Sequence, residues 1–109
     1  MSSKSTVKER IEALGAELPG IVEAFGKLHD AATRDGALDR KTKRLVMVGI
    51  AVSQRCEACI RTHVGAAVQE GATRAEILEA AGAAILMGGG PAAATTATVV
   101  VDVLGELGV

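Results

Sequence analysis

The sequence has almost no aromatic residues: its 109 residues include one Phe and no Trp or Tyr. Single-stranded nucleic acids are commonly bound by stacking of bases on aromatic side chains, and this chain lacks such a platform. An excess of positive charge is also missing, because 12 basic residues stand against 13 acidic ones and the formal net charge is −1. Both absences argue against nucleic-acid binding.

A long hydrophobic run is absent as well. The longest apolar stretch, residues 80–87, is much shorter than the roughly 20 residues that a membrane-spanning helix needs. Residues 1–9 are polar and charged, unlike the apolar segment of a signal peptide. We therefore expect a cytoplasmic protein without a membrane segment. In such a protein the two cysteines are expected to cycle between dithiol and disulfide or to bind metal.

Short interruptions, most of them containing proline or glycine, stand between segments with helical periodicity and divide the chain into helices. These interruptions fall at residues 18–20, 34–36, 53–55, 71 and 88–91. The segments between them predict five or six helices and no strand. The length suits one domain, so we predict a single all-α bundle over residues 1–109.

Several residues predict where these helices begin and end. Asp39 is placed to cap the third helix, and Thr73 with Glu76 matches a capping box for the fifth. Gly71 suits the left-handed position after a helix, and Pro91 suits the first position of the last one. The cluster Arg40, Lys41, Lys43 and Arg44 is most simply interpreted as a solvated helix face.

The last two predicted helices carry little charge around their circumference, particularly at residues 80–87 and 92–101. A helix with so little polar surface is usually buried on more than one side. A domain of this size has few helices with which to cover both faces. We therefore predict homo-oligomerisation.

Cys56, Cys59 and His63 form the candidate site, because their spacing places all three on one face of a helix. Helical Cα atoms three residues apart are roughly 5 Å from each other, within the range of a disulfide. His63 lies one turn beyond Cys59 and should reach back toward its sulfur. We hypothesise that His63 deprotonates or stabilises Cys59, with Cys56 as the partner thiol.

Cys56 has two further features that favour a thiolate. If it opens the helix, its sulfur lies near the positive end of the helix dipole, and Arg55 precedes it. These influences would make a thiol reactive at neutral pH.

Other roles for the three residues remain open. Cys56, Cys59 and His63 could supply three ligands to zinc or copper, although a structural zinc site needs a fourth, and His29 is the only other histidine. Buried, inert cysteines in a non-catalytic assembly scaffold are the third possibility. Covalent haem attachment is excluded, because Ile60 follows the second cysteine where histidine is required.

Four segments together resemble the carboxymuconolactone decarboxylase superfamily, and most closely its AhpD-like alkylhydroperoxidase branch. They are Leu38-Asp39-Arg40-Lys41-Thr42, Cys56-Glu57-Ala58-Cys59 with His63, Gly71-Ala72-Thr73 and Gly89-Gly90-Pro91. The resemblance implies an all-α, AhpD-like fold assembled into homo-trimers or homo-hexamers. It also implies reduction of a hydroperoxide or disulfide substrate without a cofactor, at the expense of a dithiol electron donor.

The resemblance further assigns roles within the site. Cys59 would be the attacking thiol, Cys56 the resolving thiol and His63 the proton shuttle. The resemblance also implies a relay glutamate twelve residues before the first cysteine, where this sequence has Arg44. Arginine cannot act as a general base, so a family member without peroxidase activity is a further alternative.

Overall fold

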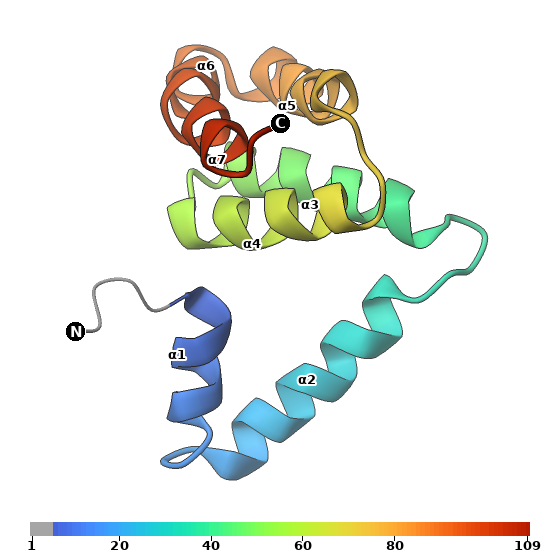
Figure 1. The fold of residues 1–109 in the computed structure, drawn as a ribbon, viewed down its shortest axis with the longest axis vertical. Coiled ribbons are helices and arrows are strands. Elements are labelled where there is room, and N and C mark those ends of the chain that lie inside the picture. Colours follow the sequence, from blue (N-terminus) through green and yellow to red (C-terminus); the bar gives the residue numbers. More distant parts are fainter. Residues whose placement is uncertain (1–5) are drawn as a thin grey trace. The chain divides into compact units, whose positions relative to one another are not determined.

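The computed structural model describes residues 6–109, and these are almost entirely helical (Figure 1). Residues 1–5, part of the segment predicted not to be a signal peptide, lie outside the described residues. The helices are α1 (Val7–Leu14), α2 (Pro19–Thr33), α3 (Arg40–Ser53), α4 (Glu57–Gln69), α5 (Arg74–Gly88), α6 (Gly90–Thr95) and α7 (Val101–Glu106), with a π-helical segment, η2 (Thr96–Val100), before α7. No strand occurs within residues 6–109, which confirms the all-α class.

Tertiary contacts divide the chain into two units, one ending at Arg34 and the other formed by Asp35–Val109. The prediction of one domain over residues 1–109 is not tested by this division and stays a prediction. The candidate site lies wholly within the second unit.

The first unit consists of α1 and α2, which contact each other. Thr6 caps α1: its hydroxyl accepts from the Glu9 amide, and the Glu9 carboxylate accepts from the Thr6 amide. Pro19 lies in the first turn of α2, where its missing N–H is not needed. Large apolar side chains of α2 are exposed within one chain, with Ile21 and Leu28 each about two-thirds accessible.

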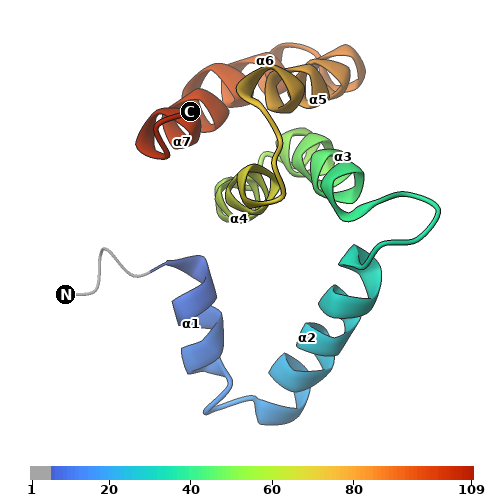
Figure 2. The same cartoon turned by 45° about the vertical axis from the view of Figure 1, so that its right-hand side comes forward.

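The second unit has two layers. Figures 1 and 2 show α3 and α4 side by side, with α5 and the α6–η2–α7 rod packed over them. Helix α3 packs against both α4 and α5 and therefore joins the layers. The largest fully buried side chains of the core come from every layer: Ile60, Ile77, Leu104, Val48, Val52, Val64 and Val100.

The helix ends of this unit agree with the sequence-based predictions. The Asp39 carboxylate accepts from the Thr42 amide at 2.8 Å, and the Thr73–Glu76 capping box is complete. Gly71 has a φ of 95°, the left-handed conformation predicted for the residue after α4. The amides of Gly71 and Ala72 then bond back to Val68 and Ala67, which completes a Schellman motif.

The last predicted helix differs from expectation in two respects. It begins at Gly90, so Pro91 follows the first helical residue, and its middle turn is π-helical. The Thr96 and Thr98 hydroxyls donate to the carbonyls of Ala92 and Ala94, four residues earlier. We attribute the wider turn to this competition for carbonyls, which cannot be predicted from a hydrophobic pattern.

No helix of the described residues has the length and apolar character to cross a membrane.

Candidate functional site

Cys56 is held at the very start of α4 by a tight connection from α3. Arg55 has a φ of 54°, and the amides of Arg55 and Cys56 bond to the carbonyls of Val52 and Ala51. These bonds form a Schellman motif with arginine where glycine is usual. Cys56 then serves as the N-cap of α4. Cys56 therefore meets the condition stated from the sequence, since it stands at the start of α4.

Cys59 lies in the first turn of α4 and forms a disulfide with Cys56 across a Cα–Cα distance of 5.2 Å. The Cys59 amide also donates to the Cys56 sulfur at 3.2 Å. The sulfur of Cys56 thus occupies the place in which a capping side chain usually accepts a hydrogen bond. A thiolate at that place would receive the same amide hydrogen and the positive end of the helix dipole.

A small cavity of about 120 Å³ lies between α3 and α4. Cys59 and His63 line it from α4, Met47, Ile50 and Ala51 line it from α3, and Gln54 lines it from the connection. Cys59 and His63 are both half-buried, and Ala51 is buried. Sequence reasoning did not identify the α3 residues or Gln54. Gln54 lies in the interruption at residues 53–55, close to Cys56 in the sequence, and this proximity was the one signal that it could line the site.

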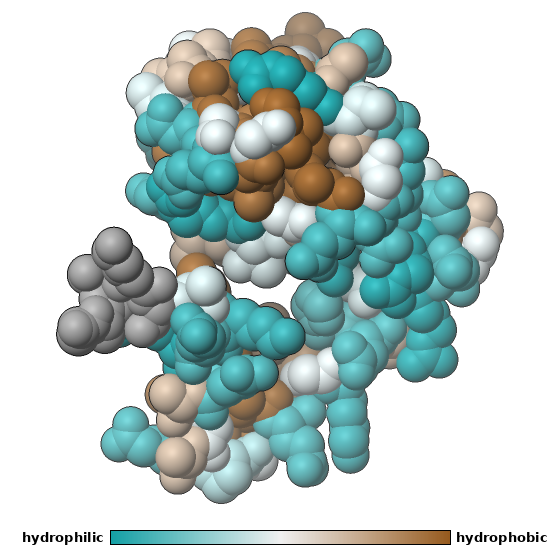
Figure 3. Space-filling view, viewed as in Figure 1, coloured by the Kyte–Doolittle hydropathy of each residue, from teal (hydrophilic) through white to brown (hydrophobic). Residues whose placement is uncertain are grey.

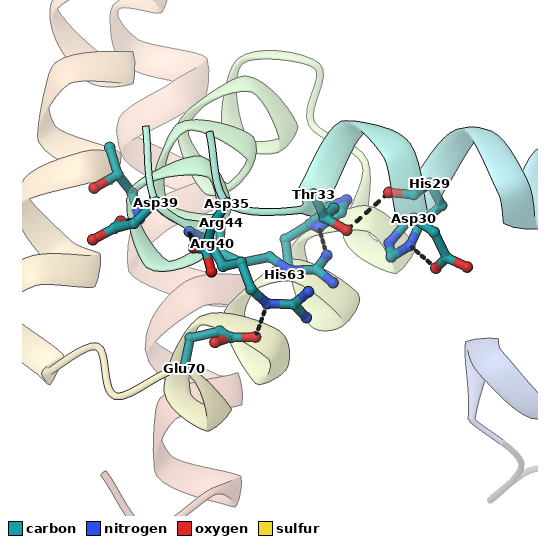
Figure 4. Close-up of polar contacts among 10 residues, drawn as sticks. His29, Asp30, Thr33, Asp35, Asp39, Arg40, Arg44, His63 and Glu70 are labelled. Carbon is teal, nitrogen blue, oxygen red and sulfur yellow. Dashed lines mark hydrogen bonds and ion pairs between the residues drawn. The ribbon is translucent and has the colours of Figure 1, made fainter. Parts of the chain in front are cut away.

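His63 has a partner that the sequence did not predict. Its Nδ1 atom lies 3.2 Å from Nη1 of Arg44, one turn into α3 (Figure 4). Arg44 is only 7% exposed, so its assignment to a solvated helix face is wrong. Burial lowers the pKa of the Arg44 guanidinium from its ordinary value, and Arg40 adds to this while Glu70 opposes it. An arginine nevertheless stays a cation and a hydrogen-bond donor at neutral pH.

Two other cations of the same cluster are also paired across helices. Arg40 Nε lies 2.9 Å from the carboxylate of Glu70 at the end of α4 (Figure 4), and Lys41 Nζ lies 2.9 Å from that of Glu76 on α5. The pKa of Glu76 is lowered mainly by its hydrogen bond to the Lys41 side chain and, to a smaller extent, by its hydrogen bond to the Thr73 backbone. The cluster therefore ties α3 to both of its neighbours.

Within residues 6–109, no three His, Cys, Asp or Glu side chains are placed to hold a metal ion. The two sulfurs of the hypothesised metal set are joined to each other.

Comparison with known proteins places these features in a family. The profile of the carboxymuconolactone decarboxylase family matches residues 19–102. The chain belongs to this family. The match includes Arg44, Cys56, Cys59 and His63.

Solved structures of family members have the same fold. A carboxymuconolactone decarboxylase family protein from Legionella pneumophila superposes with a TM-score of 0.79 at 41% sequence identity, over 84% of this chain and 81% of that one. A family protein from Thermotoga maritima, for which involvement in an antioxidative response has been suggested, gives 0.72 at 39% identity, over 78% of this chain and 87% of that one.

A curated relative from Cupriavidus necator is an uncharacterised protein. It is 36% identical over 73 residues, which are 67% of this chain and 65% of that protein. The match thus spans just under two-thirds of that relative's length.

Proposed function

We propose that this protein is a thiol-dependent peroxidase of the AhpD-like type, with Cys59 as nucleophile and Cys56 as resolving thiol. The observation that carries the proposal is the Cys56–Cys59 disulfide next to a cavity shared by Cys59 and His63. The antioxidative response suggested for the Thermotoga maritima relative supports the same chemistry. Thiol-disulfide exchange with a disulfide substrate would use the same pair.

The proposed reaction needs no group beyond two thiols and an external reductant. The Cys59 thiolate attacks the terminal hydroperoxide oxygen, so an S–O bond forms, the O–O bond breaks, and the alkoxide leaves as an alcohol after taking a proton. The Cys56 thiolate then attacks the Cys59 sulfur, so the S–S bond forms, the S–O bond breaks, and the hydroxide leaves as water after taking a proton from solvent. A dithiol donor reduces this disulfide and is itself oxidised.

The surroundings of the two sulfurs suit these roles. Cys59 lines the cavity in which a small hydroperoxide would be held, whereas Cys56 is not among the lining residues. Cys56 instead sits at the N-cap, where the helix terminus would stabilise the thiolate that must attack second. His63 lines the cavity with Cys59, where its imidazole can stabilise the Cys59 thiolate by hydrogen bonding.

The direct test follows hydroperoxide consumption by the reduced protein with a dithiol donor in excess. We expect catalytic turnover in the wild type, no reaction in Cys59→Ser, and a single stoichiometric turnover ending in a sulfenic acid in Cys56→Ser. Mass spectrometry of the two variants identifies the oxidised sulfur. Hydroperoxide reduction that survives in Cys59→Ser would refute the assignment.

We also propose that the working protein is a homo-trimer or homo-hexamer in the cytoplasm, where dithiol donors are kept reduced. A shallow apolar groove of about 560 Å³ between α3 and α5 supports assembly. Leu86 and Met87 on α5 are each 84% exposed in one chain. Figure 3 shows apolar side chains gathered on the surface of the second unit. Contiguous apolar surface of this kind marks contact sites.

A further inference from the structure

The contact between Arg44 and His63 allows only one direction of hydrogen bonding. Arg44 Nη1 and His63 Nδ1 are 3.2 Å apart. A guanidinium has five N–H donors and no acceptor. Arg44 must therefore donate, and Nδ1 of His63 must accept with its lone pair. In a neutral imidazole whose Nδ1 carries no hydrogen, the hydrogen is on Nε2.

We infer that Arg44 is a positioning residue that holds His63 as the neutral Nε2–H tautomer, which makes His63 a hydrogen-bond donor to Cys59 or to the peroxide instead of a base. Taking the Cys59 proton at Nε2 would need the opposite tautomer, with the hydrogen on Nδ1. That tautomer would direct an N–H at an arginine N–H. The consequence for catalysis rests on the proposed peroxidase function, whereas the tautomer does not.

Three features of Arg44 make it suited to this role. It is 7% exposed, so its side chain is confined by packing. It is not among the residues that line the cavity, so it acts through His63. Its burial lowers the pKa of the guanidinium, yet an arginine remains protonated in proteins and always presents a donor.

The chemistry at position 44 selects the tautomer. A carboxylate is an acceptor only and would draw the hydrogen onto Nδ1, which leaves Nε2 with a lone pair for general-base work. The arginine reverses this arrangement. In the resulting cycle the Cys59 proton leaves to solvent, and the His63 Nε2–H stabilises the thiolate that remains.

The test reads the tautomer directly by long-range proton–nitrogen NMR of the uniformly ¹⁵N-labelled full chain. Spectra are recorded on oxidised and reduced protein at about pH 9, well above the ordinary histidine pKa of about 6.5. His63→Gln identifies which of the two imidazole patterns belongs to His63. We expect the pattern of a ring with an unprotonated Nδ1 and a protonated Nε2 in the wild type.

Variants at position 44 then test the cause. Arg44→Lys, which keeps a donor, should preserve the Nε2–H pattern. Arg44→Met should give a mixture of tautomers, and Arg44→Glu should invert the pattern. Arg40→Met, one turn earlier on α3 and paired with Glu70, is the matched control and should leave His63 unchanged.

Catalysis gives a second readout. The rate of hydroperoxide reduction at neutral pH should fall roughly tenfold in Arg44→Met and recover in Arg44→Lys. A tenfold fall corresponds to a rise of about one unit in the pKa of Cys59, which lowers the thiolate fraction by that factor. A wild-type spectrum with the hydrogen on Nδ1 would contradict the inference by itself, so a variant that fails to fold does not prevent the test. A wild-type Nδ1–H pattern, or an Nε2–H pattern that persists in both Arg44→Met and Arg44→Glu, would overturn the inference. An Nε2–H tautomer in a protein without peroxidase turnover would instead remove the proposed function alone.

Discussion

Helix α3 borders two hollows of different character. On its α4 side lies the cavity of about 120 Å³ that contains Cys59 and His63. On its α5 side lies the groove of about 560 Å³, lined by alanines, aliphatic residues, Met87 and a few uncharged polar residues. Ile50 and Gln54 border both hollows.

This difference suits the two proposed roles of α3, one in the reaction and one in assembly. The small cavity is lined by the Cys59 sulfur and the His63 imidazole. Arg44 contacts Nδ1 of that imidazole but does not line the cavity. The groove contains no ionisable side chain with which to activate a substrate, but it is wide and apolar. Such a surface gains free energy when a partner removes it from water. The two sides of one helix thus suit a reaction and a protein contact.

The largest expected effect concerns the imidazole in the small cavity. His63→Gln should lower the rate of hydroperoxide reduction about 100-fold, because a positioned proton donor typically contributes at least that factor. His29→Gln changes the only other histidine, which lies in the first unit, and should leave the rate unchanged. Steady-state kinetics of both variants with one hydroperoxide make the comparison. Equal losses in the two variants would contradict the assignment.

The next effect concerns the groove. Met87→Glu places a charge on a residue that lines it, so burial against a partner would become unfavourable. We expect the assembled species to dissociate toward the 11.1 kDa chain, as measured by light scattering after size exclusion. Ala75→Glu adds the same charge in the exposed first turn of α5, outside the groove, and should keep the wild-type mass. An unchanged mass in Met87→Glu would show that the groove is not the contact.

A smaller effect is expected at the start of the helix that forms one wall of the groove. Thr73→Ala removes the hydroxyl that accepts from the Glu76 amide and should lower the free energy of unfolding by about 1 kcal/mol. Thr62→Ala, at an exposed position inside α4, is the control and should change it by less than about 0.5 kcal/mol. Urea titrations followed by circular dichroism measure both. Similar losses would mean that the cap contributes no special stability.

The smallest effect concerns the ion pair between α3 and α5. The pKa of Glu76 is lowered in the folded protein from its ordinary value of 4.5. Its contribution to stability is therefore present above that value and is lost as the pH falls through the lower folded value. Unfolding by urea at about pH 7 and about pH 3 should show a smaller pH dependence in Glu76→Gln than in the wild type. Glu79→Gln, an exposed carboxylate of the same helix, is the control, and an equal change there would contradict the prediction.

Features set by neighbouring residues were predictable from the sequence. Asp39, Gly71 and the Thr73–Glu76 pair act within one turn, so their spacing carries the whole signal. The approach of Cys56 and Cys59 follows from helix geometry in the same way.

Features that depend on packing between helices were not predictable. Arg44 and His63 are 19 residues apart on different helices, and a cluster of four cations gives no sign of which one is buried. Only the family resemblance distinguishes Arg44 from the other three cations, because it implies a glutamate at that position. The π-helical turn was missed because it depends on which carbonyls the threonine hydroxyls bind.

We propose that the start of α4 holds two activated thiols, Cys56 at its N-cap and Cys59 in its first turn, and the pH dependence of their alkylation tests this most directly. The reduced, metal-free protein is alkylated over a range of pH, and each cysteine is followed by mass spectrometry. We predict apparent pKa values for Cys56 and Cys59 below the ordinary thiol value of about 8.5, with the Cys59 value rising in His63→Ala and the Cys56 value rising in Arg55→Ala. Two slow thiols with ordinary pKa values, unchanged in both variants, would contradict the claim.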